Sequence, residues 1–408
     1  MTQPDTMLAG VRVLDLTTFL AGPFSTQILT DMGAEVIKVE SREGDHARTI
    51  PPHFVRGDSA YFHTVNRTKA SAQLDLKHPD GVEVFLAMVR GADVVIENFR
   101  PGVMARLGLS AERLLETNPR LVVCSISGFG QDGPRRDAPA YDAMVQALSG
   151  SMSLTGHPGS PPTRMGLPIG DLAGGMYGAL GILGALIRRD RTGRGERIDV
   201  SMFDAQVAML GYQATYYLHS GEIPGPQGAG HVSIPTYRSF RCRDDRYVMV
   251  TANTERMWHG LCTALGIERL LEVPAFRTNA DRLRNAEALW RELEPAFADV
   301  ASIDAVAALE AHGVPVGAVQ DVAQALADDQ TSARSMVVEL PGEGGDSMRV
   351  PGNPIKAASM RPESGYRLSP ALGADTGRVL RDVAGLDEPA IRALQEAGVA
   401  GPFDDPGA

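Results

Sequence analysis

Short apolar stretches of strand type alternate with helical patterns over the first half of the chain, and this alternation constrains the fold more than any other feature. Five such stretches lie at residues 11–16 (VRVLDL), 35–40 (EVIKVE), 93–97 (DVVIE), 121–127 (LVVCSIS) and 197–200 (RIDV). Helical patterns extend to Met32 and over residues 81–90 and 202–211. Strands that alternate with helices form a mostly parallel sheet covered on both faces. The sequence therefore predicts an α/β protein with a Rossmann-like sheet.

The composition changes at residues 221–230 (GEIPGPQGAG), a stretch rich in proline and glycine that is typical of a linker. Beyond it, residues 237–241 and 247–252 flank an Asp-Asp pair, which is a hairpin signature, and helical segments follow. At 408 residues, two domains are the natural expectation. We predict three segments: a large Rossmann-like domain over residues 1–220, a small α+β domain over 221–325, and a C-terminal segment over 326–408.

The bulk composition excludes several classes of protein. The net charge of −11 argues against a nucleic acid or an anionic membrane as partner. The three cysteines, Cys124, Cys242 and Cys262, are widely spaced, and no pair has metal-ligand spacing. We therefore expect no metal and a reducing compartment. The first residues, MTQPDTMLAG, lack the basic and apolar regions of a signal peptide, so we expect a cytoplasmic protein.

Residues 166–187 (GLPIGDLAGGMYGALGILGALI) contain a single charged residue, Asp171. Burying an ionised carboxylate is costly unless it is paired or hydrogen-bonded, so this position needs an explanation. Asp171 could be the N-cap of a helix over residues 172–189. Alternatively it is a reactive carboxylate, with Gly170, Gly174 and Gly175 letting a substrate approach the backbone. Seven glycines and an aspartate favour a buried helix over a membrane span.

Loops that follow the strands of an open α/β sheet are the expected ligand site. The loop after residues 93–97 combines Asn98, Phe99 and two arginines, Arg100 and Arg106, which suits a phosphate and a purine ring, although a solvated turn would look similar. Lys69 and Lys77 are further phosphate candidates. Candidates for a substrate carboxylate, each also compatible with a structural role, are His46, Arg48, Arg164 and His231. The first loop, TTFLAGPFS, lacks the dinucleotide-binding glycine pattern.

Several stretches, taken in order, resemble the family III CoA-transferases, which include formyl-CoA transferase. They are LAGVRVLDLTTFLAGPFSTQILTDMGAEVIKVE, NRTKASAQLDLKHPDG, ADVVIENFRPG, APAYDAMVQALSG, GLPIGDLAGGMYGALGILGAL, TGRGERIDVSMFDA and LGADTGRVL. The resemblance covers nearly the whole chain. It implies a large domain built from both chain ends, a small domain from the middle, and an interlocked homodimer.

The resemblance also implies roles for individual residues. Asp171 falls on the catalytic aspartate, which takes up acyl and CoA groups in turn as an anhydride and a thioester. The residues that fall on CoA-binding positions are Phe19, Ala21, Arg42, Leu74, Lys77, Asn98, Phe99, Arg106 and Tyr141. CoA and its acyl esters are thus the expected substrates, and no metal is implied.

The departures from the family pattern concern the substrate. AGHVSIPTYRSF replaces a glycine-rich loop, and together with PTRMG it looks like the succinyl-CoA-dependent dicarboxylate transferases. We therefore expect Arg48, Arg164 or His231 to contact a dicarboxylic acid. The racemases that act on 2-methylacyl-CoA esters use a histidine where this chain has Tyr141, so racemisation is the alternative activity, and a non-catalytic CoA-binding subunit is another. Asp375 occupies a position often held by histidine, and the sequence offers no physical reason for it.

Overall fold

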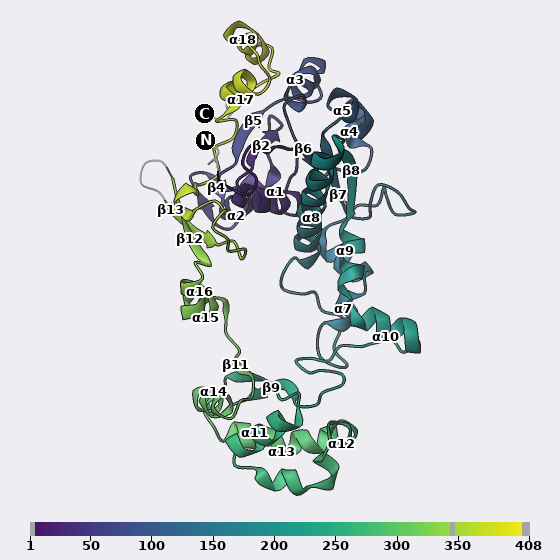
Figure 1. Ribbon diagram of the computed structural model, residues 1–408, viewed down its shortest axis with the longest axis vertical. Helices are drawn as coiled ribbons and strands as arrows, with labels where there is room; N and C mark the ends of the chain where they lie inside the picture. The colour runs from purple at the N-terminus through teal and green to yellow at the C-terminus, as the bar shows by residue number, and fades with distance from the viewer. Residues whose placement is uncertain (1–4, 343–346, 402–408) are drawn as a thin grey trace. The chain divides into compact units, whose positions relative to one another are not determined.

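The computed structural model describes residues 5–342 and 347–401, which divide into two compact units (Figure 1). The first unit contains the chain up to Ser151, Arg164–Gly221 and the chain from Ser332 onward. The second unit contains Met152–Thr163 and Glu222–Thr331. The first unit is thus assembled from segments at both ends of the chain, and a short piece before Arg164 belongs to the second unit.

A six-stranded parallel sheet forms the centre of the first unit, which confirms the predicted α/β fold with a mostly parallel sheet. Its strands are β1 (Arg12–Asp15), β2 (Glu35–Glu40), β5 (Ala70–Gln73), β6 (Val94–Glu97), β7 (Val122–Ser127) and β8 (Glu196–Ser201). They lie in the order β5-β2-β1-β6-β7-β8. The chain therefore reverses its direction of winding between β1 and β6, and such a switch point opens a crevice at the carboxyl ends of the strands.

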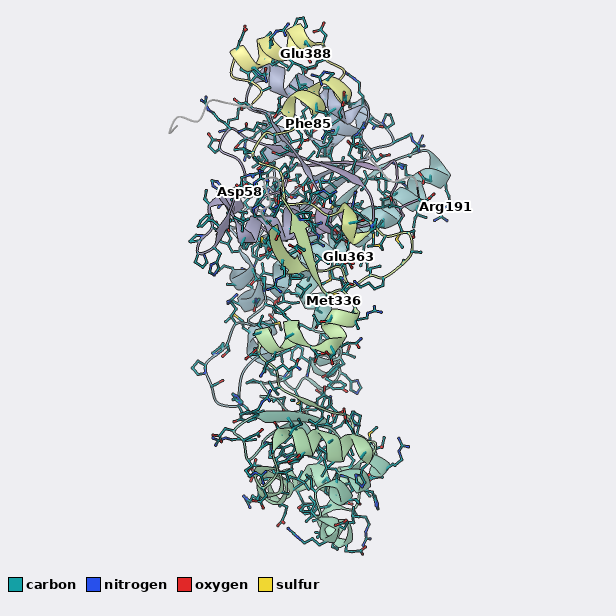
Figure 2. All side chains as sticks on the ribbon, turned by 90° about the vertical axis from the view of Figure 1, so that its left-hand side faces the viewer. Asp58, Phe85, Arg191, Met336, Glu363 and Glu388 are labelled. Carbon is teal, nitrogen blue, oxygen red and sulfur yellow. The ribbon has the colours of Figure 1, made fainter. Side chains whose placement is uncertain are left out.

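Helices cover both faces of this sheet because successive residues of each strand point to opposite sides. Val13 of β1 belongs to a core with α1 (Ala21–Asp31) and α8 (Ile169–Thr192). Leu14 belongs to the opposite core, which includes the fully buried Phe85 of α3 (Figure 2). The helices of this second face are α3 (Pro79–Val89), α5 (Ala111–Thr117), α17 (Thr376–Asp382) and α18 (Glu388–Glu396).

Strand β5 was not predicted, because its sequence, ASAQ, has none of the β-branched or large apolar residues that mark a strand. The C-terminal segment completes its outer edge. Asp375 accepts a hydrogen bond from Ser71 N at 3.0 Å, its own amide donates to Ser71 O at 2.9 Å, and Thr376 Oγ1 accepts from Gln73 N. Asp375 therefore has a structural role, because it supplies the edge of the sheet with the hydrogen-bond partners that another strand would give.

Helix α8 packs its glycines against the sheet and α1. A Cβ atom at Gly175 would lie 2.5 Å from Ala21 O, and one at Gly178 would lie 2.7 Å from the Ile126 side chain. A Cβ atom at Gly174 would lie 2.9 Å from Met202. The prediction that Gly174 and Gly175 let a substrate approach was therefore wrong, since these glycines serve close helix packing. Helix α8 is long and apolar enough to cross a membrane, but half of its most apolar window is buried inside the protein.

The second unit contains a three-stranded antiparallel sheet in the order β11-β10-β9. The predicted hairpin is formed by β9 (Tyr237–Arg241) and β10 (Tyr247–Thr251). Phe240 and Phe297 stack at 4.2 Å beside the buried Trp258. The other elements of this unit are β11 (Val316–Ala318), α11 (Glu255–Ala264), α12 (Asn279–Arg284), α13 (Ala286–Ala298), α14 (Ser302–Ala311) and α15 (Val322–Ala327).

Shorter elements complete the chain. They are β3 (Phe54–Val55), β4 (Asp58–Ser59), α2 (Ala60–Asn66), α4 (Val103–Arg106), α6 (Asp142–Leu148), α7 (Ser151–Leu154), α9 (Met202–Met209), α10 (Tyr212–Ser220), α16 (Asp329–Ala333), β12 (Val337–Pro341) and β13 (Ser347–Pro351). Of these, α2, α4 and α6 contribute to the site described next.

Candidate functional site

A cavity of about 580 Å³ lies at the switch point, beyond the carboxyl ends of β1, β6 and β7. It gathers seven of the residues proposed from the sequence: Phe19, Ala21, Asn98, Phe99, Tyr141, Arg164 and Asp171. Residues that sequence reasoning did not propose also line it, among them Tyr61, Arg136 and Asp142. The loops after the strands and the first turns of α6 and α8 thus meet at one place.

A neighbouring cavity of about 350 Å³ shares Thr18 and Phe99 with the first. It is lined by three more of the proposed CoA residues, Arg42, Leu74 and Lys77. Arg106 lies on α4, is exposed, and lines neither cavity. The two cavities thus adjoin at Thr18 and Phe99, with the exposed cations Arg42 and Lys77 lining one and Asp171 the other.

Asp171 is the third residue of α8, which begins at Ile169, so the N-cap interpretation was wrong. The residue at the N-cap is Pro168, which gives no side-chain hydrogen bond. The Asp171 carboxyl is partly buried in the cavity wall. Burial and the neighbouring Asp142 carboxylate raise the pKa of Asp171 to about 7. Asp171 is therefore a carboxyl group that changes charge near neutral pH.

Asp142 joins α6 to the first turn of α8. Its Oδ1 accepts a hydrogen bond from Gly170 N at 2.7 Å, and its Oδ2 accepts one from Gln146 Nε2 at 2.7 Å. The guanidinium of Arg164 lies 3.9 Å from Oδ2, and its side chain is 51% exposed. Two hydrogen bonds thus keep a carboxylate beside Asp171, while Arg164 stays largely accessible to a ligand.

The loop after β1 is held by side chains from two other loops. Asn98 Oδ1 accepts from Thr18 N and Asn98 Nδ2 donates to Thr18 O, both at 2.8 Å. Asp45 Oδ1 accepts from the amide of Phe19, whose backbone has a φ of 63°. This left-handed conformation is costly for a non-glycine residue, so the surrounding contacts must hold it. The hydrogen bonds of Asn98 therefore position the loop that forms the cavity wall.

Aromatic side chains form the rim and one wall of the cavity. The rings of Phe19 and Tyr141 meet edge to face at 6.4 Å, and the ring of His46 lies 6.0 Å from that of Phe19. Tyr141 is 70% exposed. Tyr61 of α2 lines the wall, and burial together with the Asp171 carboxylate raises the pKa of its hydroxyl above the usual range. No sequence signal marked Tyr61, because its approach to Asp171 depends on the fold alone.

Arg48 does not lie in the cavity, so its proposed role as a substrate ligand is corrected. Its guanidinium is buried, donates to both Glu40 oxygens, and contacts Asp58 at 2.8 Å. It also stacks over the Phe62 ring at 3.9 Å. Arg48 therefore stabilises the fold behind the site.

Lys69 is likewise buried: it contacts Asp15 at 3.0 Å and is not a phosphate ligand. His231 lies in the second unit, where it stacks on Tyr237. Gly170, the third of the glycines expected to let a substrate approach, is buried in the first turn of α8, where its amide donates to Asp142. Among the described residues, no cluster of histidine, cysteine and carboxylate side chains suits a metal ion.

Comparison with known proteins gives a consistent result. The sequence model of CoA-transferase family III matches residues 8–376. The chain is 44% identical to acetyl-CoA:oxalate CoA-transferase of Acetobacter aceti, over 85% of this chain and 88% of that protein. It is 35% identical to human succinyl-CoA:glutarate CoA-transferase, over 96% of this chain and 89% of that protein. A CAIB/BAIF family protein from Brucella suis has a similar crystal structure, with a TM-score of 0.83, 37% identity, and coverage of 93% of this chain and 100% of that one.

Proposed function

Since this chain belongs to CoA-transferase family III, we propose that it moves CoA from succinyl-CoA or a related dicarboxylic acyl ester to a free dicarboxylic acid, with Asp171 as the covalent catalyst. The observation that carries the proposal is the Asp171 carboxyl itself, which lies in the cavity wall beside Asp142 where the residues expected to bind CoA converge. The names of two relatives, which give oxalate and glutarate as acceptors, favour a dicarboxylic acid.

The proposed reaction is a sequence of four acyl substitutions at carbonyl carbon. An Asp171 oxygen attacks the thioester carbonyl of the donor, the C–S bond breaks, and a mixed anhydride and the CoA thiolate form. The thiolate attacks the aspartyl carbonyl, which releases the donor acid and leaves an aspartyl-CoA thioester. The acceptor carboxylate attacks this thioester and releases the thiolate. The thiolate then attacks the acceptor's acyl carbon, so that acyl-CoA forms and the Asp171 carboxylate is restored.

The electrostatics of the cavity suit this role for Asp171. A carboxylate is a weak nucleophile when it is strongly stabilised by cations or hydrogen bonds. The like charge of Asp142 does the opposite, since it disfavours the ionised form of Asp171 and raises its basicity. The cavity must then hold the reactants in position, an effect that reaches about 7–11 kcal/mol in well-oriented systems.

Arg164 is the proposed ligand of the distal carboxylate of the acid. It lines the cavity together with Asp171, and its guanidinium retains free capacity because its contact with Asp142 is long, at 3.9 Å. Bidentate contacts with a carboxylate are a property of the guanidinium group. His231 stays a candidate in the second unit.

We also propose a homodimer. On the face of α8 away from the sheet, Leu180 and Ile187 are 62% and 59% exposed, and Leu218 of α10 is 80% exposed. We base the proposal on these exposed side chains, because exposed apolar surface is typical of a subunit interface when it is contiguous. A stable folded monomer in sedimentation velocity at micromolar concentration would contradict this.

One experiment tests the proposed function. The protein is incubated with succinyl-CoA and a panel of free mono- and dicarboxylic acids, and new CoA esters are identified by mass spectrometry. We expect dicarboxylic acids to be converted, and in Arg164→Ala the KM for the dicarboxylic acid should rise far more than the Kd for CoA. Exchange of the α-proton without a new ester would indicate a racemase instead. No reaction with any acid would leave the CoA-binding subunit as the better description.

A further inference from the structure

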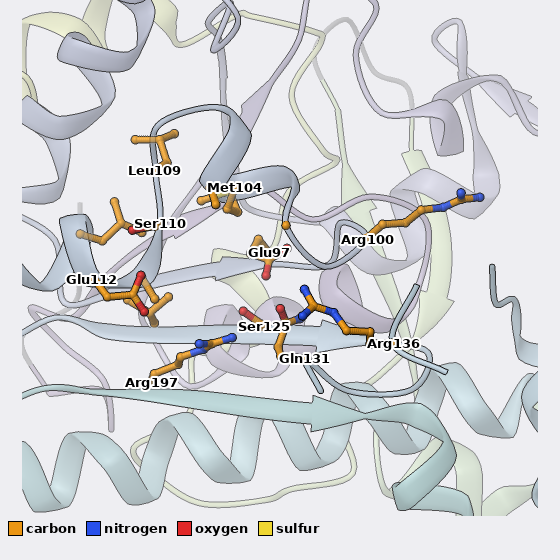
Figure 3. A pocket seen from close by; sticks show the side chains of 15 residues that line it. Glu97, Arg100, Met104, Leu109, Ser110, Glu112, Ser125, Gln131, Arg136 and Arg197 are labelled. Carbon is orange, nitrogen blue, oxygen red and sulfur yellow. The ribbon is translucent and has the colours of Figure 1, made fainter. Parts of the chain in front are cut away.

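A third cavity lies behind the loop that lines the catalytic cavity, and the proposed reaction makes no use of it. Its volume is about 230 Å³, and it is formed by the end of β6, by Val123 and Ser125 of β7, by the start of α5, and by Arg197 of β8 (Figure 3). Arg100 and Arg136 line both this cavity and the catalytic one. In Figure 3 the Arg136 and Arg197 side chains point toward Ser125 and Gln131 from two sides, while Arg100 turns away.

The floor of this cavity is a buried carboxyl group. Glu97 is 5% exposed, and its Oε2 accepts a hydrogen bond from Phe99 N at 2.8 Å. Burial raises the pKa of Glu97 to about 7, against the hydrogen bonds from Ser125 and the Phe99 amide. The other charged or titratable groups that act on Glu97 are Arg197, Asp199 and the Cys124 thiol. At neutral pH a protonated Glu97 is therefore readily available as a hydrogen-bond donor.

The wall of this cavity also contains a polar group that has no hydrogen-bond partner among the described residues. Within the described part of the chain, Gln131 Nε2 is buried and makes no hydrogen bond. A buried amide group without a partner is destabilising, and a ligand that accepts from it removes that cost. The amide of the same residue is fixed by a 2.8 Å hydrogen bond to Asp199. The cavity thus offers two guanidinium groups, an amide donor and a carboxylic acid in about 230 Å³.

We propose that this cavity binds a compact monocarboxylate anion, a ligand distinct from the dicarboxylic acid at Asp171. A carboxylate oxygen can accept from the guanidinium groups and from Gln131 Nε2, and the other can accept from protonated Glu97. The charges favour a single negative charge. Arg136 and Arg197 supply two positive charges, since Arg100 turns away from the cavity in Figure 3, and the carboxylate of Glu112, which also lines the cavity, offsets one. A dianion such as phosphate would leave a negative charge without compensation.

Binding in this site is linked to protons through Glu97. An anion beside Glu97 favours its neutral form, so binding takes up a proton when Glu97 is ionised beforehand. The affinity should therefore fall as the pH rises through about 7, the pKa of Glu97. Acetate itself stays ionised over this range, and the guanidinium groups stay charged.

The test measures acetate binding to the full chain, without CoA, by isothermal titration calorimetry. We expect acetate to bind about tenfold more tightly at pH 6 than at pH 8.5, since one proton is linked to binding. Arg197→Ala should weaken binding by at least about tenfold, because Arg197 lines this cavity and not the catalytic one. Arg194→Ala, a nearby exposed arginine, is the matched control and should bind like the parent. Glu97→Gln should retain binding and lose its pH dependence.

Three outcomes would overturn the proposal: unchanged acetate binding in Arg197→Ala, equal affinity of the parent at both pH values, or tighter binding of inorganic phosphate than of acetate. The measurement contains no CoA ester, so its result is independent of whether Asp171 is the covalent catalyst. Conversely, a failure to transfer CoA would leave the acetate result standing.

Discussion

The first unit contains two pairs of acidic side chains in opposite electrostatic surroundings. Asp15 and Asp45 lie in the fold behind the loop after β1, where Lys69 and Lys38 contact them at 3.0 and 2.9 Å. All four are buried. Although burial alone would raise it, these ammonium groups hold the pKa of Asp15 well below its ordinary value.

Asp142 and Asp171 face the cavity without such a partner. Arg164 lies 3.9 Å from Asp142 with a largely exposed side chain, and the pKa of Asp171 rises to about 7 because of burial and the neighbouring carboxylate. The comparison sets opposite charges paired inside the fold against two carboxyl groups at the cavity, where the proposed mechanism gives the like charge a part in the reactivity of Asp171. Asp45 of the first pair also accepts the amide hydrogen bond of Phe19, so this pair helps to hold the loop after β1.

The largest effect is expected on breaking the reactive pair. In Asp171→Asn, transfer should fall by at least about a thousandfold, since an amide cannot form the anhydride. CoA binding and fold should be retained. Steady-state transfer assays with calorimetric CoA binding check this, and Asp132→Asn, an exposed aspartate, is the control. Near-parental turnover would show that Asp171 is not the nucleophile.

Breaking the buried ion pair of Lys69 and Asp15 should lower the stability of the fold. Lys69→Met leaves Asp15 buried without its closest cation, and we expect a loss of about 3–5 kcal/mol in the free energy of unfolding. The urea midpoint measures this. Lys77→Met removes an exposed lysine and should change little. A parental midpoint in Lys69→Met would mean that the buried pair does not hold the fold.

A conservative substitution can remove the negative charge of Asp142 without removing its hydrogen-bonding oxygen. Asp142→Asn keeps an oxygen for Gly170 N and takes away the charge that raises the pKa of Asp171. Because Asp171 must be ionised to attack, kcat/KM should rise with pH through about 7 in the parent. In the variant this rise should move to lower pH by part of the shift, because burial, the larger cause, stays while the charge of Asp142 is gone. An unshifted profile would show that Asp142 does not tune Asp171.

The smallest effect is expected at Lys77, an exposed residue that lines the 350 Å³ cavity where we expect CoA to bind. Lys77→Ala should weaken CoA binding by about 0.5–1.5 kcal/mol, because an exposed cation is well screened by solvent. The loss should shrink at high salt. Calorimetry with CoA and dephospho-CoA would show whether the 3′-phosphate is the group contacted. An equal loss for both ligands would assign Lys77 to the diphosphate.

The sequence predicted the sheet well because apolar runs of strand type and helical periodicity are local properties. Strands β2 and β9 have the predicted boundaries. Strand β5 escaped prediction because its pairing with β2 and its capping by Asp375 come from distant parts of the chain. In the same way, the ion pairs that withdraw Arg48 and Lys69 from the site form only in the folded chain.

Sequence reasoning named several residues that line the cavity, but it did not find the neighbouring charge that raises the pKa of Asp171. Phe19 and Asn98 follow strands of the sheet and line one cavity, as their loop positions indicated, and Asp171 of α8 lines the same cavity. Asp142 was missed as a partner of Asp171, because a contact between residues that far apart leaves no periodic signal. The glycines of α8 were misinterpreted for a related reason: the sequence alone does not distinguish a glycine that permits close helix packing from one that admits a ligand.

The covalent state of Asp171 during turnover tests the central claim most directly. The protein is incubated with succinyl-CoA, treated with borohydride or hydroxylamine, digested, and examined by mass spectrometry. We expect Asp171 to be reduced to the alcohol by borohydride and converted to the hydroxamate by hydroxylamine, with neither product in Asp171→Asn. Modification of another carboxyl group, or complete turnover without any modified aspartate, would contradict the account.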